Sequence, residues 1–240
     1  MGPVTDLETR AARHAALADV TRLAVVDLLA LQDASPREIA ERLGLGSNLL
    51  AHHLAVLERA GLVERRRSEA DRRRSYVRLV DEALPQESVT SPAWAGAGDL
   101  VFVCTGNSAR SQLAAAIWNS HRGEGVPVAR SAGTHPAARV DPRAVDVAVR
   151  RGLQLAERPV ALDPVDLEGG ALVVTVCDAA HEELVAGAAT GSLPESLHWS
   201  VPDPVPHGDA AFEAAADELR HRVLRLCPTP STTADEGVHP

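Results

Sequence analysis

The chain has 240 residues and a formal net charge of −9, a length that suits two modest domains. It lacks both an apolar run of membrane-spanning length and a signal-peptide pattern, so we expect a cytoplasmic protein with no membrane partner. The three cysteines are too few and too far apart for a disulfide framework, which fits a reducing compartment. Residues 59–78 hold eight arginines against three acidic residues, and such a basic patch is what nucleic-acid binding requires.

The first eighty residues alternate helical patterns with tight turns and end in a charged hairpin. Asp19 is a candidate helix cap, Ser35-Pro36-Arg37-Glu38 is a capping box, and Gly44 and Gly61 are helix stops. Glu69 to Asp71 forms a polar tip between two strands. We predict helices over 9–17, 20–29, 36–43 and 49–60, and strands over 62–67 and 73–80. This order predicts a mainly α winged helix-turn-helix over residues 1–82, with an arginine-rich wing.

Two segments, Ala16 to Leu23 and His52 to Val63, resemble the ArsR-type repressors, which are dimeric winged-helix proteins that leave DNA when a metalloid or metal binds. The resemblance covers about residues 10–80. It implies operator DNA as a partner and a homodimer formed through this domain. It places Ser47, Asn48 and His52 where such proteins have groove-facing residues, whereas the arginines of the wing would meet phosphates. Those arginines are Arg72, Arg73 and Arg74.

This segment departs from the repressor pattern at two places. Leu49 and Ala51 are apolar where recognition helices are usually polar, and residues 1–103 contain no cysteine, so the thiolate site of arsenite sensors is missing. His52 and His53 are adjacent and diverge by about 100° on a helix, so they cannot chelate one ion. We expect no metal site, with one histidine contacting DNA and the other packing.

Residues 83–98 are rich in Pro, Ser, Gly and Ala and predict a linker, ahead of a second domain over 99–228 and a disordered tail over 229–240. In the second domain short apolar runs alternate with helical segments. We predict strands over 100–103, 128–131, 171–176 and 197–200, and helices over 110–121, 142–151 and 211–226. The alternation predicts an α/β doubly wound parallel sheet with its site at the carboxyl end of the first strand. His135, His181 and His207 fit no ligand spacing and are predicted to lie on the surface.

The segment between the first strand and the first helix of this domain has the composition of an anion-binding loop that carries a nucleophile. Cys104 ends the strand, and Arg110-Ser111 opens the helix. Small residues between them let the backbone N–H groups turn inward at a helix N-terminus, which favours both a bound anion and the thiolate form of the cysteine. Arg110 can grip a tetrahedral oxyanion through two parallel hydrogen bonds, and Ser111 can donate to the thiolate. The loop itself comprises Thr105, Gly106, Asn107, Ser108 and Ala109.

These residues resemble the low-molecular-weight tyrosine phosphatase superfamily, and within it the arsenate reductases, because Gln112 stands where the phosphatases usually have proline. The resemblance runs from about Asp99 to Leu226 and includes Ser131-Ala132-Gly133-Thr134 and Asp203-Pro204. It implies that Asp203 is the general acid and that Asn107 and Ser131 support the loop. With Cys104, Arg110 and Ser111, these residues form the candidate catalytic set. The family chemistry implies no bound cofactor and no metal.

A small oxyanion suits this site better than an aryl phosphate. The related phosphatases carry tyrosines after the Asp-Pro pair, whereas residues 203–208 have none, and the only tyrosine in the chain is Tyr76. Reduction also needs a second thiol. Cys177 matches the first of two further cysteines in thioredoxin-coupled reductases, but residues 178–186 lack the other, so Cys177 is either a resolving thiol or a buried bystander. We therefore expect an external thiol, mycothiol or glutathione with a glutaredoxin-like protein, in preference to thioredoxin.

Three functions remain open from the sequence. The favoured one is a bifunctional arsenic-resistance protein that reduces arsenate to arsenite and carries a DNA-binding repressor domain. The second is a protein tyrosine phosphatase whose helix-turn-helix dimerises or localises it. The third is a transcriptional regulator that senses an oxyanion without turnover.

Overall fold

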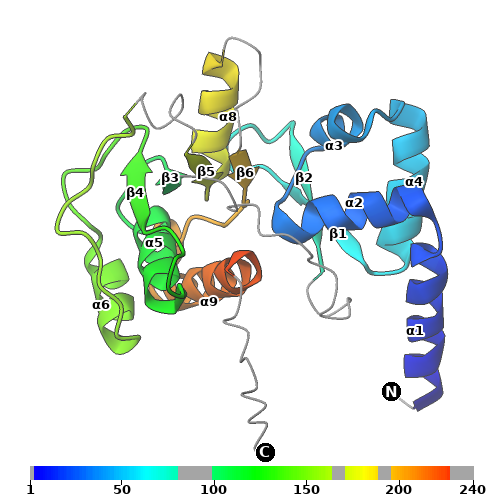
Figure 1. Cartoon of the computed structure of the whole chain (residues 1–240), viewed down its shortest axis with the longest axis horizontal. Helices are drawn as coiled ribbons and strands as arrows, with labels where there is room; N and C mark the ends of the chain where they lie inside the picture. The colour runs from blue at the N-terminus through cyan, green and yellow to red at the C-terminus, as the bar shows by residue number, and fades with distance from the viewer. Residues whose placement is uncertain (1–2, 81–98, 164–170, 189–195, 228–240) are drawn as a thin grey trace, which may run out of the picture.

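The structure is a computed structural model that describes residues 3–80, 99–163, 171–188 and 196–227. The linker expected over 83–98 and the tail expected over 229–240 lie outside these ranges. Figure 1 shows the winged-helix unit (residues 3–80) beside the α/β unit (the described residues from 99 to 227). No helix in the described ranges is long and apolar enough to cross a membrane.

The winged-helix unit has the predicted order of elements, which are α1 (Pro3–Leu17), α2 (Val20–Leu31), α3 (Pro36–Leu43), α4 (Ser47–Arg59), β1 (Val63–Arg67) and β2 (Ser75–Leu79). Asp19 caps α2 by accepting a hydrogen bond from the Arg22 N–H at 2.9 Å. The capping box of Ser35 and Glu38 opens α3, and Gly44 ends it with φ of 63°. The first helix begins at Pro3, six residues before the predicted start.

The core of this unit forms where the helices meet the hairpin, and Ile39, Leu54, Leu57 and Val77 are fully buried there. β1 and β2 pair antiparallel from Val63↔Leu79 to Arg67↔Ser75. The hairpin therefore carries residues 68–74 as its tip, which we call the wing tip. The predicted winged helix-turn-helix is confirmed.

The α/β unit consists of β3 (Leu100–Cys104), α5 (Arg110–His121), β4 (Ala129–Gly133), α6 (Pro142–Arg150), β5 (Leu172–Thr175), α8 (Asp178–Gly187), β6 (Ser196–His198), the 3-10 helix η2 (Val205–His207) and α9 (Asp209–Leu226). The sheet is parallel with the order β4-β3-β5-β6, so the predicted doubly wound sheet is confirmed. The sequence did not reveal α8. Its buried residues include the polar Asp178 and His181, so an apolar helical period is absent.

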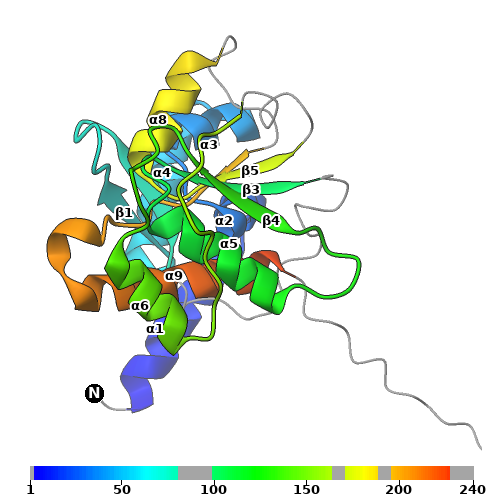
Figure 2. The ribbon, with the colours of Figure 1, turned by 90° about the vertical axis from the view of Figure 1, so that its left-hand side faces the viewer.

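The sheet topology fixes where the site lies. β3 is central and wholly buried, α5 crosses from it to β4, and the chain then returns over β3 to β5. Cys104 ends β3, and Cys177 follows β5 by two residues. Both thiols therefore lie at the carboxyl ends of adjacent strands, at the switch point where such sheets bind ligands. Figure 2 shows α5, α6 and α9 together on one side of the strands.

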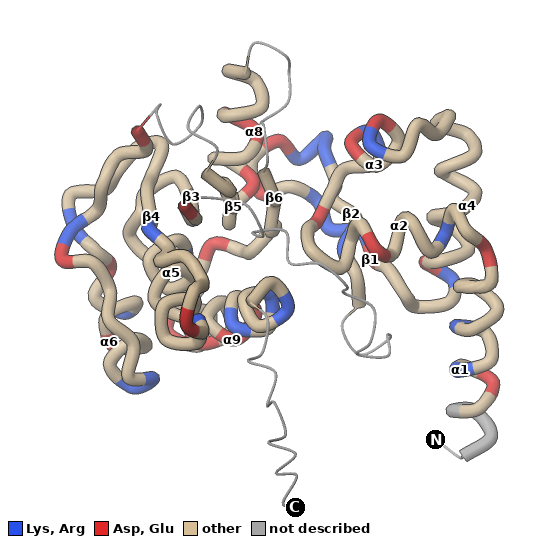
Figure 3. The backbone as a smooth tube through the Cα atoms, viewed as in Figure 1, with Lys and Arg blue, Asp and Glu red and all other residues tan. Residues whose placement is uncertain are grey.

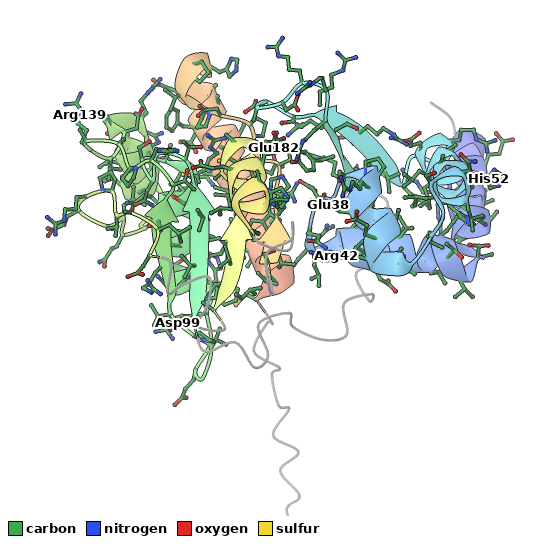
Figure 4. All side chains as sticks on the ribbon, turned by 90° about the horizontal axis from the view of Figure 1, so that it is seen from above. Glu38, Arg42, His52, Asp99, Arg139 and Glu182 are labelled. Carbon is green, nitrogen blue, oxygen red and sulfur yellow. The ribbon has the colours of Figure 1, made fainter. Side chains whose placement is uncertain are left out.

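The two units pack directly against each other. Asp33 after α2 forms an ion pair with Arg222 of α9 at 2.8 Å, and the Trp199 indole N–H donates to the Leu31 carbonyl. The Glu38 carboxylate of α3 is hydrogen-bonded to the Nε2 of His181 in α8 at 3.0 Å. Figure 4 places Glu38 and Glu182 where the units meet, with His52 on the far side of the winged-helix unit.

The prediction that His181 lies on the surface is wrong. His181 is buried and stacks on His198 in the contact between the units, whereas His135 and His207 are exposed as expected. The Nε2–H of the His181 ring donates to the Glu38 carboxylate of the other unit. A partner that comes from so far along the chain leaves no local pattern.

Candidate active site

The loop from Cys104 to Ala109 is oriented by the segment that follows β4. The carbonyl oxygens of Cys104, Thr105 and Gly106 accept hydrogen bonds from the N–H groups of residues 134, 135 and 137, at 3.1, 2.8 and 2.9 Å. The Ser108 carbonyl accepts from the N–H of Asp141 at 2.9 Å. Because the N–H of a peptide points opposite to its C=O, the N–H groups of this loop face the other way, toward the cavity. The loop is thus arranged as an oxyanion cradle.

Cys104 lies at the floor of this cradle, 3% exposed. Its Sγ accepts the N–H of Asn107 at 3.2 Å and is 3.0 Å from the Ser111 hydroxyl. The Ser111 oxygen already accepts from the Asn107 amide at 2.8 Å, so its own proton is free to point at the sulfur. Two hydrogen-bond donors therefore converge on Sγ. The first turn of α5, which has no side-chain cap, lies beside it.

Asn107 holds the cradle in shape. It is fully buried and adopts the left-handed region with φ of 47°, which asparagine tolerates better than most residues. Its Oδ1 accepts from the Val160 N–H at 2.8 Å and from the Gln112 amide at 3.3 Å. Each polar atom of the side chain thus has a partner in or behind the loop, so Asn107 fixes the direction of its own N–H.

The glycine that the cradle requires most is Gly133, at the end of β4. A Cβ there would lie 2.7 Å from the Thr105 carbonyl oxygen and 2.9 Å from the Asn107 nitrogen, whereas at Gly106 the nearest atom is the Ser108 hydroxyl at 3.2 Å. From the sequence, Gly106 was the glycine expected to matter for the turn of the loop. The closer constraint lies on the neighbouring strand, where only the fold brings the two backbones together.

Arg110 and Asp203 face each other across the cradle. The guanidinium of Arg110, 11% exposed, donates to the Val201 carbonyl at 2.9 Å and lies 3.4 Å from the Asp203 carboxylate. Asp203 reaches this place from the loop after β6, and its Oδ1 also accepts from the Val205 N–H at 3.2 Å. The pair can bind a tetrahedral anion on one side and supply a proton on the other.

Cys177 borders the same cavity and is 2% exposed, and its Sγ lies 3.5 Å from the Thr105 hydroxyl. Burial raises the pKa of the Cys177 thiol, against the opposing effect of Arg110. Cys227 is buried directly after α9, next to the His121 carbonyl, and does not line the cavity. All three cysteines are free thiols.

The cavity has a volume of about 790 Å³ and is lined by both units. Its residues from the α/β unit include the cradle, Cys177, Asp178 and Asp203. Its residues from the wing are Arg67, Ser68, Glu69, Ala70 and Arg72. The sequence did not place any wing residue at this site, because the contact depends on how the two units pack.

The remaining predicted residues are not at the cavity. Ser131 lies on β4 beside Phe102, and its hydroxyl makes no hydrogen bond within the described ranges, so its supporting role stays a prediction. Ser47, Asn48 and His52 are exposed on α4, and Arg73 and Arg74 are exposed on the wing tip. His53 is buried, as expected for the packing member of its pair. Among the described residues no group of three or more His, Cys, Asp or Glu side chains is placed to hold a metal ion.

Comparison with known proteins assigns both parts of the chain. Residues 99–235 match the profile of low molecular weight phosphotyrosine protein phosphatases, and residues 19–65 match that of the arsR family of bacterial regulatory proteins. An arsenate reductase of Bacillus cereus is 31% identical over 128 residues, which cover 53% of this chain and 92% of that protein. An arsenate reductase of Halalkalibacterium halodurans is 32% identical over 137 residues, covering 54% and 95%.

A crystal structure of arsenate reductase from Archaeoglobus fulgidus is 28% identical, with a TM-score of 0.44 over 53% of this chain and 98% of that one. The match to the phosphatase profile spans more than half of the chain and contains the whole cradle. This chain therefore belongs to the low molecular weight phosphotyrosine protein phosphatase family and carries an arsR-type helix-turn-helix ahead of that domain.

Proposed function

We propose that this chain reduces arsenate to arsenite at Cys104. The observation that carries the choice of substrate is the lining of the cavity, in which the described residues include no Phe, Tyr or Trp. An aryl phosphate needs aromatic walls around the anion site, whereas an inorganic oxyanion needs only the cradle and Arg110. The relatives named arsenate reductase support the same choice.

The residues of the site divide the chemistry between them. The Cys104 thiolate attacks As(V) while Arg110 and the loop N–H groups hold the oxygens, and Asp203 protonates the departing oxygen, which leaves as water. A second thiol then attacks the Cys104 sulfur. The S–As bond breaks, its electron pair reduces arsenic to As(III), arsenite leaves and a disulfide remains. In sum, two thiols become one disulfide as arsenate becomes arsenite and water.

The second thiol is supplied from outside in this proposal. Cys177 is buried and its pKa is raised, so at neutral pH it is mainly a protonated thiol and a weak nucleophile. A small thiol such as mycothiol or glutathione, regenerated by a glutaredoxin-like protein, can enter a cavity of about 790 Å³. Cys177 remains the alternative resolving thiol if none is required.

Arsenite production by the purified chain, with each thiol in turn, tests the proposal. Cys104→Ser should abolish turnover, and Asp203→Asn should reduce the rate by roughly 10²- to 10⁴-fold with little loss of anion affinity, because a general acid acts in the transition state. A parallel assay with an aryl phosphate tests the phosphatase alternative. Turnover of Cys104→Ser within a few fold of wild type would refute the assignment, and anion binding without turnover of either substrate would favour the sensor.

We further propose that the winged-helix unit binds operator DNA as a homodimer. The arsR-type match and the exposed Ser47, Asn48 and His52 on α4 support this. Binding of the full chain to DNA should weaken steeply with salt, and Arg74→Ala should reduce the slope by about one phosphate contact. A salt-independent interaction would exclude this role.

A further inference from the structure

We propose that the wing tip is a wall of the active site, in which Arg72 attracts the oxyanion and Glu69 occupies Arg110 until the oxyanion displaces it. The inference rests on the proposed function only in taking a tetrahedral oxyanion as the ligand. It assigns residues of the winged-helix unit to substrate binding in the α/β unit.

The wing tip is fixed over the cavity by hydrogen bonds to α8. The Ser68 hydroxyl donates to Glu182 at 2.7 Å, and the Asp71 N–H donates to the same carboxylate at 3.2 Å. The Glu69 N–H donates to Asp178 at 2.9 Å. Figure 3 shows the hairpin tip directly beside α8. Ser68 is 2% exposed and Asp178 4%, so water is largely excluded from these bonds and the tip has a defined position.

Glu69 places a carboxylate at the anion-binding arginine. Its Oε2 accepts the Asp203 N–H at 2.8 Å and lies 3.9 Å from the Arg110 guanidinium. With Asp203 itself at 3.4 Å, Arg110 faces two carboxylates. An incoming dianion must compete with Glu69 for Arg110, and the charge of Glu69 repels it. Removing that charge should therefore tighten oxyanion binding.

The wing also supplies positive charge at the entrance. Arg67 and Arg72 line the cavity, and within the described ranges neither makes an ion pair, whereas Arg73 next to them is paired with Asp71 at 2.9 Å and does not line the cavity. An unpaired guanidinium beside a cradle of inward N–H groups attracts an anion by its charge. Arg73 on the same tip is therefore a matched control for Arg72.

Two measurements test the role of the wing tip in anion binding. One is calorimetric titration of the full chain with inorganic phosphate, and the other is the KM for arsenate. Unit charges about 4 Å apart in water interact enough to change affinity roughly fivefold. We expect Glu69→Gln, which keeps an acceptor for the Asp203 N–H, to bind phosphate roughly fivefold more tightly than wild type. Arg72→Ala should bind it roughly fivefold more weakly, and Arg73→Ala should match wild type. The KM for arsenate should move in the same directions.

The outcomes separate this inference from the proposed function. Three results would each refute the role of the wing tip in anion binding. They are unchanged phosphate affinity in both Glu69→Gln and Arg72→Ala, equal weakening by Arg72→Ala and Arg73→Ala, and no phosphate binding by wild type. If arsenite forms but the KM for arsenate is insensitive to Glu69 and Arg72, the reductase assignment is supported and the role of the wing tip is refuted. If phosphate affinity shifts as expected but no arsenite forms, the role of the wing tip is supported and the reductase assignment is refuted.

Discussion

Asp33 is the residue whose removal should disturb the packing of the two units most. Its carboxylate is 2% exposed and accepts three hydrogen bonds from the α/β unit, two from Arg222 at 2.8 and 3.1 Å and one from the Ser200 N–H at 2.7 Å. Burial would lower the pKa of Arg222, but Asp33 and Glu218 outweigh it and raise the pKa. Asp33→Ala removes the principal partner of a guanidinium that is only 15% exposed.

Removing one partner of a buried ion pair costs about 3–5 kcal/mol, because the other charge stays buried without compensation. Here Arg222 keeps Glu218 at 3.1 Å, so we expect Asp33→Ala to lower the free energy of unfolding by about 3 kcal/mol, the lower end of that range. The exposed pair of Arg37 and Glu41, with side chains 87% and 59% exposed, provides the control, and Arg37→Ala should cost under about 0.5 kcal/mol.

Urea unfolding followed by tryptophan fluorescence and circular dichroism measures the effect. Trp199 is 1% exposed and bonds Leu31 across the contact between the units, so its fluorescence reports on their separation. In Asp33→Ala the fluorescence change should precede the loss of helix signal, because the contact weakens before either core unfolds.

A double-mutant cycle with Arg222→Met tests the cause. The double variant should be less destabilised than the sum of the two single variants by about 2 kcal/mol, since neither charge is then left alone. Strict additivity, or a loss below about 1 kcal/mol for Asp33→Ala, would show that the ion pair does not hold the units together.

Two further predictions concern the cradle and pH. Gly133→Ala should lower arsenate turnover by at least about tenfold, because its Cβ cannot fit against Thr105 and Asn107, whereas Gly123→Ala has open space and should be neutral; equal activities would contradict this. Burial and the neighbouring His198 lower the pKa of His181. The unfolded chain therefore binds a proton at His181 more readily than the folded chain, so the free energy of unfolding decreases as pH falls below about 6.5. Burial would raise the pKa of Glu38, but hydrogen bonds from His181 and Ser35 outweigh it and lower it to about 2, so Glu38 stays charged between pH 5 and 7. Urea midpoints should therefore fall from pH 7 to 5 in wild type and fall less in His181→Asn, and parallel slopes would contradict the role of His181.

The sequence alone determined what depends on neighbours along the chain. The capping box at Ser35, the left-handed stop at Gly44 and the start of α5 at Arg110 were all predicted at the residues where they occur. These signals are local because a helix end is satisfied by residues within one turn of it. The short apolar runs of β3 and β5 likewise predicted a buried parallel sheet, since strands covered on both faces need continuous apolar sequence.

Tertiary structure alone decided the features that depend on distant partners. The sequence suggested neither the burial of His181, nor the tight fit at Gly133, nor the presence of Glu69 beside Arg110. Each of these contacts joins residues from separate elements, and two of the three cross between the units, so no periodicity or spacing records them. The sequence therefore identified the loop that begins at Cys104 as the candidate site, whereas the packing of the two units decided which residues face that loop from the other side.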